Sequence, residues 1–314
     1  MKFLVTGGAG FIGSNFCEFL LKKNHDVICL DNLNSGSKTN IKHLSNYENF
    51  NFVKKDILKP LNYDADWILN FASPASPKKY QEDPIFTLNT NFIGTQNLLE
   101  LSKKNKISFL QASTSEVYGD PLTHPQNEKY FGNVNTFGPR SCYDEGKRIS
   151  ESLCYEYQKK HNVNIRIPRI FNTYGPNMDI DDGRVISNFI VAALKKKDLT
   201  IYGDGNQTRS FCYIDDLIDG IYKLLSKKSK RLMAPINIGN PTELTINDIA
   251  KLVLDLCNSK SKIKYMKIPQ DDPQKRKPDI SKITKELNWE PKVNIKNGIL
   301  KTIEYFNKIL KLST

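Results

Sequence analysis

The sequence is poor in the residues that build metal centres and disulfide frameworks. Among 314 residues there are four histidines and six cysteines, and no two cysteines have C-x-x-C spacing. The histidines lack the spacing of metal ligands, so no metal site is expected. Several cysteines lie inside apolar segments, which indicates reduced thiols rather than disulfides; the six are Cys17, Cys29, Cys142, Cys154, Cys212 and Cys257.

Long apolar runs are missing as well. No stretch of 18 apolar residues occurs, so no transmembrane helix is expected. The first predicted strand begins at residue 2, which leaves no room for a secretion signal ahead of it. We therefore expect a cytoplasmic protein without a membrane partner. The chain shows no internal repeat or low-complexity linker, and its length suits one large α/β domain or two modest ones.

The charge is the one unusual feature of the composition. Lysine and arginine outnumber aspartate and glutamate by 46 to 34, which gives a formal net charge of +12. Basic proteins often bind nucleic acid. Here the lysines are dispersed, with short runs at 195–197 and 227–231. We interpret the charge as solvated surface and expect no nucleic-acid partner, although a positive field favours capture of an anionic nucleotide.

A glycine-rich turn follows the first predicted strand. Gly8, Gly10 and Gly13 complete the pattern G-x-G-x-x-G at the start of an apolar-periodic helix. Such glycines let backbone N–H groups approach a pyrophosphate at the helix N-terminus. A second strand ends at Asp31, whose carboxylate suits ribose hydroxyls and would repel the extra phosphate of NADP. The pattern predicts an NAD site, against the alternative of a tight turn without a ligand.

Tyr143 and Lys147 stand four residues apart in the segment 141–148 (SCYDEGKR). On a helix this spacing places both side chains on one face. A tyrosine ordinarily ionises at about pH 10, and a neighbouring ammonium favours its phenolate, so the pair can abstract a proton near neutrality. Alone the pair is a weak signal, because Tyr-x-x-x-Lys often arises by chance.

Strand and helix patterns alternate along the first half of the chain. Strands are predicted near 2–6, 26–30, 51–54, 66–70, 107–112 and 163–167, and helices near 11–23, 84–104 and 142–160. This alternation predicts the fold class α/β, with a Rossmann-like doubly wound parallel sheet.

The pattern becomes irregular after about residue 169. Helices are predicted at 184–195, at 215–225, at 246–256 with Thr245 as its cap, and at 295–310. We interpret this part as a smaller, interwoven C-terminal substrate-binding domain. Residues 1–170 and about 212–238 would form the NAD-binding domain, and about 171–211 and 239–314 the substrate-binding domain.

Polar residues directly follow the predicted strand 107–112. Thr114, Ser115 and Glu116 would lie beyond its carboxyl end, where ligands bind in open α/β sheets. By themselves they suit an ordinary polar exit from a strand. Together with Tyr143 and Lys147 they resemble the extended short-chain dehydrogenase/reductase family. Its members oxidise a sugar-nucleotide hydroxyl with tightly bound NAD, using a Ser or Thr, a Tyr and a Lys.

Within that family the chain is similar to the UDP-glucuronic acid decarboxylases (UDP-xylose synthases). The resemblance extends over nearly the whole chain in the family's order. It lies in segments 71–77 (FASPASP), 114–121 (TSEVYGDP), 138–148 (GPRSCYDEGKR), 169–176 (RIFNTYGP), 182–185 (DGRV), 202–211 (YGDGNQTRSF) and 271–279 (DDPQKRKPD). In the related dehydratases the triplet at 114–116 reads Thr-Asp-Glu, so Ser115 argues against dehydration.

The resemblance implies conversion of UDP-glucuronate to UDP-xylose. Tyr143 would take the proton of the sugar 4-hydroxyl while hydride leaves that carbon for NAD, Lys147 would hold the phenolate, and Thr114 would bond the same oxygen. The resulting 4-ketone is β to the carboxylate, which lets carbon dioxide leave before hydride returns. Glu116 and Arg276 would lie at that carboxylate, with Glu116 working through a water or carrying a proton.

Further contacts follow from the same resemblance. The implied cofactor residues are Gly7, Gly10, Phe11, Ile12, Gly13, Asp31, Asn32, Asp56, Ile57, Ala72, Ser113, Tyr143 and Lys147. The implied substrate residues are Ser115, Asn97, Tyr157, Asn172, Arg184, Tyr202, Arg209 and Arg276. Core packing explains Tyr157 nearly as well. Asn89, Pro168 and Asn177 depart from the family pattern, which puts affinity rather than reaction type in doubt.

The resemblance also implies a homodimer, in which residues 84–104 and 142–160 form a four-helix interface. Two alternative functions stay open. One is an enzyme that stops at the 4-keto pentose and releases NADH. The other is a non-catalytic protein that binds NAD or nucleic acid, against which the intact set of Thr114, Tyr143 and Lys147 argues.

Overall fold

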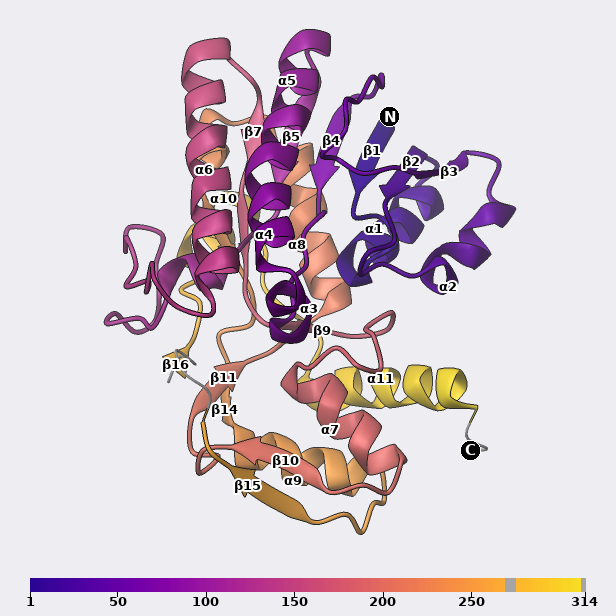
Figure 1. The fold of residues 1–314 in the computed structure, drawn as a ribbon, viewed down its shortest axis with the longest axis vertical. Helices are drawn as coiled ribbons and strands as arrows, with labels where there is room; N and C mark the ends of the chain where they lie inside the picture. The colour runs from indigo at the N-terminus through magenta and orange to yellow at the C-terminus, as the bar shows by residue number, and fades with distance from the viewer. Residues whose placement is uncertain (269–274, 312–314) are drawn as a thin grey trace.

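The computed structural model describes residues 1–268 and 275–311. A six-stranded sheet lies in the upper part of the molecule (Figure 1). Its order is β3-β2-β1-β4-β5-β7, and neighbouring strands are parallel. The strands are β1 (Lys2–Thr6), β2 (Asp26–Asp31), β3 (Phe50–Lys54), β4 (Trp67–Asn70), β5 (Ser108–Gln111) and β7 (Ile165–Arg166). The order reverses between β1 and β4, where an open α/β sheet binds its ligand. The predicted fold class is confirmed.

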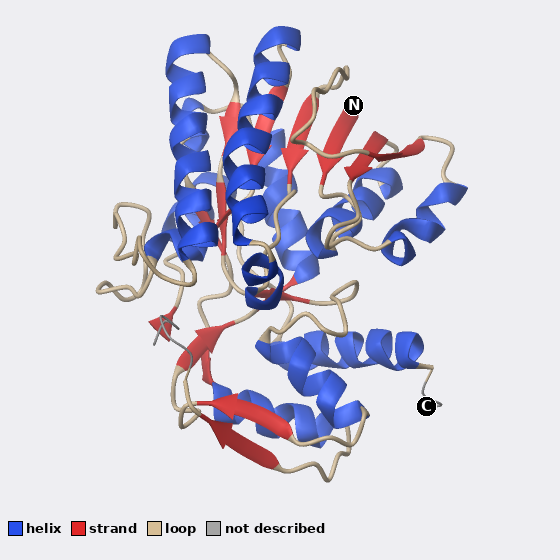
Figure 2. Ribbon diagram, in the orientation of Figure 1, coloured by secondary structure: helices blue, strands red, loops and turns tan. Residues whose placement is uncertain are grey.

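Helices cover both faces of this sheet (Figure 2), because successive strand residues point to opposite sides. Phe3 and Val5 pack in one buried cluster with α1 and α8, whereas Leu4 packs in another with α5 and α6. These helices are α1 (Phe11–Lys22), α5 (Thr95–Asn105), α6 (Ser141–His161) and α8 (Ile214–Ser226). Such two-sided burial explains the continuous apolar runs of the strands.

The predicted helix 84–104 is confirmed in its extent, although a π-helical turn interrupts its regular α-helical hydrogen bonding. The structure has α3 (Pro77–Glu82), α4 (Pro84–Asn89), the π-helical turn η2 (Thr90–Gly94) and then α5. The Asn91 side chain donates to the Thr87 carbonyl at 2.9 Å. A side chain that bonds a helix carbonyl disturbs the regular ladder, which accounts for the turn at this point.

Short strands continue the chain below the carboxyl ends of β5 and β7. A three-stranded sheet has the order β13-β8-β6, and a separate pair joins β9 to β12. The strands are β6 (Ser113–Thr114), β8 (Pro168–Ile170), β9 (Thr173–Tyr174), β12 (Cys212–Tyr213) and β13 (Ile236–Ile238). The 3-10 turn η3 (Ser115–Tyr118) follows β6. Thr114, Ser115 and Glu116, on β6 and η3, therefore lie beyond the end of the six-stranded sheet, between it and the lower part of the molecule.

The lower part in Figure 1 is built mainly from the C-terminal segments. Its elements are α7 (Val185–Leu194), β10 (Leu199–Tyr202), β11 (Thr208–Ser210), β14 (Glu243–Thr245), α9 (Ile246–Leu256), β15 (Ile263–Met266), β16 (Lys275–Arg276) and α11 (Ile295–Leu310). The remaining short elements are α2 (Lys38–Ile41), η1 (Lys42–Asn46), η4 (Lys230–Met233) and α10 (Ser281–Leu287). The predicted cap is confirmed, since Thr245 Oγ1 accepts from the Asp248 N–H at 3.0 Å. One apolar cluster runs from the sheet through Tyr174 and Tyr213 into α7, α9 and α11. The domain division remains a prediction.

Among the described helices, none combines the length and hydropathy that crossing a lipid bilayer requires.

Candidate active site

The glycine turn between β1 and α1 lies against the end of β4. Gly7 has a φ of +68°, and a Cβ there would stand 2.6 Å from the Ala72 nitrogen. A Cβ on Gly13 would come within 2.2 Å of the Gly7 carbonyl oxygen. Gly10 caps α1 without a side-chain acceptor. The turn therefore admits only glycine at positions 7 and 13, and it leaves the positive end of α1 available to an anion.

Asp31 ends β2 beside this turn. Its Oδ2 accepts from the Ala9 N–H at 2.9 Å and its Oδ1 from the Leu33 N–H at 2.7 Å. Burial raises the pKa of this carboxyl above its ordinary value, and the two backbone donors oppose that shift. A helix N-terminus and a fixed carboxylate at one crevice fit the pyrophosphate and adenosine ribose of a dinucleotide.

The residues predicted to bind the cofactor gather around this crevice. One cavity is lined by Gly7, Gly10, Phe11, Ile12, Gly13, Ser113, Tyr143 and Lys147, and an adjoining smaller one by Asp31, Asn32, Asp56, Ile57 and Ala72. Gly7 and Gly10 line both cavities. The two therefore join along the glycine turn, as an extended dinucleotide requires.

Tyr143 and Lys147 project from α6 and are both buried. The Lys147 Nζ donates to the Ala112 carbonyl at 2.9 Å and lies 5.8 Å from the centre of the Tyr143 ring. Burial lowers the pKa of Lys147 to about 8. Burial, followed by the negative Glu116, raises the pKa of Tyr143 above its ordinary value, and contact with the Thr114 hydroxyl opposes this.

This result corrects one expectation, since Lys147 does not lower the pKa of Tyr143 in the protein alone. The ammonium faces the Ala112 carbonyl, and the cost of burying a phenolate dominates. The phenol is therefore neutral at pH 7 in the protein alone, although the charge of Arg184 acts to lower its pKa.

Tyr80 of α3 stacks on Tyr143. The ring centres are 5.1 Å apart and the planes differ by 7°. Tyr80 is 1% exposed, and with Cys142 and Tyr143 it forms a separate apolar cluster. The sequence reasoning missed Tyr80. In the sequence Tyr80 stands shortly after the segment 71–77 (FASPASP), far from Tyr143 along the chain. Only the folded structure brings the two rings together.

Glu116 lies between two arginines. Its Oε1 accepts from Arg276 Nη1 at 2.8 Å, and its Oε2 forms a close ion pair with Arg140 Nη2. Burial alone would raise the pKa of Glu116, but Arg276 and then Arg140 outweigh it and lower the pKa to about 2. The two guanidiniums thus favour the ionised form of Glu116 in the protein alone. Both roles predicted for it beside the substrate carboxylate, through a water or with a proton, remain predictions.

Arg276 is almost fully buried, with 2% of its surface exposed. Besides Glu116, it donates to Ser115 Oγ at 2.9 Å and to the Gly119 carbonyl at 3.1 Å. The structure thus brings Arg276 of β16 against the loop after β6, as predicted. The preceding residues 271–274 of its motif lie outside the described residues. Arg140 was not predicted, although it precedes Tyr143 by three residues and so starts the same helical turn.

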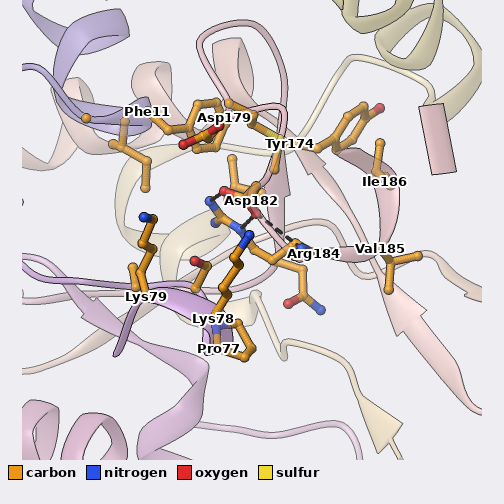
Figure 3. A pocket seen from close by; sticks show the side chains of 18 of the residues that line it. Phe11, Pro77, Lys78, Lys79, Tyr174, Asp179, Asp182, Arg184, Val185 and Ile186 are labelled. Carbon is orange, nitrogen blue, oxygen red and sulfur yellow. Dashed lines mark hydrogen bonds and ion pairs between the residues drawn. The ribbon is translucent and has the colours of Figure 1, made fainter. Parts of the chain in front are cut away.

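The larger cavity continues toward the lower part of the molecule, with a volume of about 920 Å³. Six predicted substrate residues line it: Ser115, Asn172, Arg184, Tyr202, Arg209 and Arg276. Arg184 pairs with both carboxylate oxygens of Asp182, at 2.5 and 2.6 Å, and its guanidinium lies 5.6 Å from the centre of the Phe11 ring. Figure 3 shows Lys78 and Lys79 extending from α3 toward this group.

Comparisons with known proteins agree with this geometry. The family described as GDP-mannose 4,6 dehydratase matches residues 4–302. UDP-glucuronic acid decarboxylase 1 of Danio rerio is 48% identical over 310 residues, which cover 99% of this chain and 73% of that protein. UDP-glucuronic acid decarboxylase 3 of Arabidopsis thaliana is 49% identical over 300 residues, which cover 95% and 87%. The chain belongs to the UDP-glucuronic acid decarboxylase family, within the extended short-chain dehydrogenases/reductases.

Solved structures with this fold include sugar-nucleotide enzymes of other activities. UDP-glucuronic acid 4-epimerase from Bacillus cereus, in complex with UDP-glucuronic acid and NAD, has a TM-score of 0.89 and 32% identity, covering 98% of this chain and 100% of that one. dTDP-glucose 4,6-dehydratase from Bacillus anthracis, in complex with NAD, has a TM-score of 0.85 and 30% identity, covering 98% and 97%.

Two of the substrate contacts predicted for a UDP-glucuronic acid decarboxylase are wrong. Asn97 donates to the Ile57 carbonyl at 2.9 Å and lies away from the cavity. Tyr157, on α6, belongs to the apolar cluster that α6 shares with α5, and its hydroxyl donates to Glu100 at 2.5 Å. Tyr157 lies 14 residues after Tyr143, about 21 Å farther along the axis of α6, and the alternative of core packing is the one that the structure supports.

Two of the residues that depart from the pattern of the decarboxylase family, Asn177 and Pro168, have regular local contacts in the structure. Asn177 adopts a φ of 70°, which asparagine tolerates, and donates to Ser14 Oγ at 3.1 Å. Pro168 lies opposite Ile236 in a parallel pair. Nothing in the structure explains the change at Asn89. Among the described residues there is no group of three or more potential ligands that could hold a metal ion.

Proposed function

We propose that this protein converts UDP-glucuronate to UDP-xylose and carbon dioxide, with NAD reduced and reoxidised within one cycle. The observation that carries the proposal is a single cavity with two kinds of chemistry on its wall. Thr114 and Tyr143 form an alcohol-oxidation site, and Arg276 with Glu116 forms a site for a carboxylate. The names of the relatives agree with this combination.

The described residues fit NAD at the joined cavities. The N-terminus of α1 would receive the pyrophosphate, Asp31 the adenosine ribose, and Lys147 the nicotinamide ribose. When bound, NAD supplies a positively charged acceptor that takes up a hydride and later returns it. A carboxylate at position 31 disfavours the extra phosphate of NADP.

Tyr143 accepts the proton of the sugar 4-hydroxyl, while the Thr114 hydroxyl donates to the same oxygen. Both side chains are buried, so their hydroxyls are largely shielded from bulk water. Oxidation at carbon 4 creates a ketone β to the carboxylate. The electrons of the breaking carbon–carbon bond then pass into an enolate, which polar donors at the oxygen stabilise.

Arg276 orients the departing carboxylate in this proposal. A guanidinium that held the carboxylate too strongly would stabilise the ground state and slow its loss. Glu116 already occupies Arg276 at 2.8 Å, so the guanidinium meets the substrate partly neutralised. Ser115 occupies the position at which the dehydratases carry an acid, and its hydroxyl accepts from Arg276 at 2.9 Å.

We also propose a homodimer. Large apolar side chains are exposed on α4, on η2 and on the adjoining face of α6: Ile85, Leu88, Phe92, Ile93, Ile149 and Tyr155. Exposed apolar side chains on these neighbouring helical elements support pairing with the same elements of a second copy. A cytoplasmic location remains part of the proposal, in line with the unpaired thiols of the described cysteines.

Product analysis tests the proposed activity. The NAD-loaded protein is incubated with UDP-glucuronate, and the sugar nucleotide is followed by NMR. UDP-xylose with carbon dioxide is the expected result. UDP-4-keto-pentose with stoichiometric NADH would assign the alternative reaction, and unchanged UDP-glucuronate would overturn the proposal.

A further inference from the structure

Asp144 is a buried carboxylate with an incomplete set of partners. It follows Tyr143 on α6, is 6% exposed and does not line the cavity. Its Oδ2 lies 3.8 Å from Arg140 Nε, and its Oδ1 is buried without a hydrogen-bond partner in the described structure. A buried carboxylate oxygen without a donor is costly, so its charge is only partly compensated.

The guanidinium beside Asp144 is shared with Glu116. Arg140 forms the close ion pair with Glu116 Oε2, and Arg276 holds the other oxygen of Glu116. Arg140 and Arg276 line the cavity, whereas Asp144 does not and reaches it only through its contact with Arg140. An anion that binds at these arginines in the cavity therefore competes with Glu116 and Asp144 for the same guanidinium groups.

Few other charges face Asp144 from the elements packed around it. Glu145 adjoins it on α6 and pairs with Arg148 at 3.5 Å. On α3, Lys78 and Lys79 pair with Asp181 and Glu82, and Tyr80 is close enough to feel the charge of Asp144. On α6 the same holds for Cys142 and Tyr143, and burial raises the pKa of all three groups. The sequences of α4 and η2, which also pack on α6, contain no titratable side chain.

The balance of these charges leaves Asp144 close to its titration point at neutral pH. Burial, followed by the charge of Glu116, raises the pKa of Asp144 to about 7, although Arg140 and Arg276 act in the opposite direction. A further negative charge placed at the arginines would raise this pKa again, because like charges disfavour ionisation.

We propose that Asp144 is a positioning residue that takes up a proton when the carboxylate of UDP-glucuronate binds at Arg140 and Arg276. The inference rests on the proposed function. Protonated Asp144 is neutral and forms no ion pair with Arg140, so the guanidinium of Arg140 can interact with the substrate carboxylate. When Asp144 is ionised, it competes with the substrate carboxylate for the same cation.

The stoichiometry of the reaction fits this linkage. Loss of carbon dioxide from a carboxylate consumes one proton, since R–COO⁻ and H⁺ give R–H and CO₂. Proton uptake at binding matches that requirement before the carbon–carbon bond breaks. UDP-xylose has no carboxylate, so its binding adds no negative charge at the arginines and does not cause Asp144 to take up a proton. The site thereby distinguishes substrate from product by charge.

Binding of the two sugar nucleotides as a function of pH tests the proposal. The NAD-loaded Tyr143→Phe protein is used so that UDP-glucuronate is bound but not consumed. From pH 7 upward, the affinity for UDP-glucuronate should fall by up to about tenfold per pH unit relative to UDP-xylose. Contributions from the diphosphate, NAD and Lys147 are common to both ligands and cancel in the ratio. Calorimetry in buffers of different ionisation enthalpy should show uptake of up to about one proton with UDP-glucuronate alone.

Two additional substitutions identify the group. Asp144→Asn imitates the protonated side chain, so the affinity ratio should become independent of pH and the proton uptake should vanish. Glu145→Gln, the matched control on the same helix, should keep both effects. Equal pH dependence for the two ligands, or an unchanged ratio profile in Asp144→Asn, would overturn the inference. Should Asp144→Asn fail to fold, the calorimetry of the protein with Asp144 decides alone. Absence of UDP-glucuronate binding at every pH would instead overturn the proposed function.

Discussion

Tyr80 and Tyr143 are stacked face to face, with ring centres 5.1 Å apart and planes within 7°. The stack joins α3, near the mouth of the cavity, to the phenol in the proposed oxidation site. Because Tyr80 is buried and has no hydrogen-bond partner for its hydroxyl in the described structure, its contribution is that of an aromatic surface. It fixes the plane of the Tyr143 ring and hence the direction of its oxygen.

Replacing Tyr80 tests this relationship. Tyr80→Leu removes the stacked ring and should lower kcat by about fivefold, since such a ring pair contributes on the order of 1 kcal/mol. Tyr80→Phe keeps the ring and removes only the unpartnered hydroxyl, so kcat should stay close to that of the original protein. Equal losses in the two variants would show that the hydroxyl, rather than the stack, is required.

Tyr143→Phe removes the proposed proton acceptor. We expect kcat to fall by about a thousandfold, within the range of general acid–base contributions, while NAD stays bound. Absorbance and fluorescence of the purified protein measure the bound nucleotide. Loss of NAD together with activity would indicate a structural role for the tyrosine instead.

Glu116→Gln tests the ion pairs between two buried guanidiniums. The substitution leaves Arg276 and Arg140 without their counter-ion, and the free energy of unfolding at pH 7 should fall by about 3 kcal/mol. The folded-state pKa of Glu116 is lowered to about 2, from a model-peptide value of 4.5. Its contribution is therefore complete above about pH 4.5 and is lost as the pH falls toward 2.

Urea unfolding at several pH values measures this effect. The difference between the original protein and Glu116→Gln should be constant from pH 7 to 5 and shrink toward pH 3. Glu145→Gln, which removes a partly exposed acid from the same region, should change stability by less than about 0.5 kcal/mol. A difference that is independent of pH down to 3 would contradict the assignment.

Much of this site was readable from local pattern. The glycine turn, Asp31 and Thr245 act through their immediate neighbours in the chain, so their places followed from spacing alone. Lys147 was placed correctly, but its effect on Tyr143 was not, because that effect depends on burial and on where the ammonium points. Burial and the direction of the ammonium group are determined by tertiary packing, so the spacing of residues in the sequence does not predict them.

The residues that were missed or misplaced show the same limit. Arg140 and Asp144 lie inside a recognised motif, yet the ion pair of Arg140 with Glu116, and the charge that Glu116 exerts on Asp144, depend on how η3 packs against α6. Asn97 and Tyr157 lie on predicted helices, but their hydrogen bonds go to Ile57 and Glu100 rather than to the cavity.

Phe92→Glu tests the proposed dimer. Phe92 lies on η2 among the exposed apolar residues, and a carboxylate there would be buried without a partner in a symmetric interface. Light scattering should show a dimer for the original protein and a monomer for the variant. Leu122→Glu, an exposed apolar position in the loop after η3, is the matched control and should leave the dimer intact. A monomeric original protein would contradict the proposal.

The most direct test of the central claim follows the hydrogen on carbon 4 of the sugar. UDP-glucuronate with deuterium at that carbon is converted in ordinary water with unlabelled NAD bound. If Tyr143 serves an oxidation that is reversed within one cycle, the UDP-xylose formed should keep its deuterium at carbon 4. Loss of deuterium from carbon 4, or its accumulation in free reduced cofactor, would contradict the account.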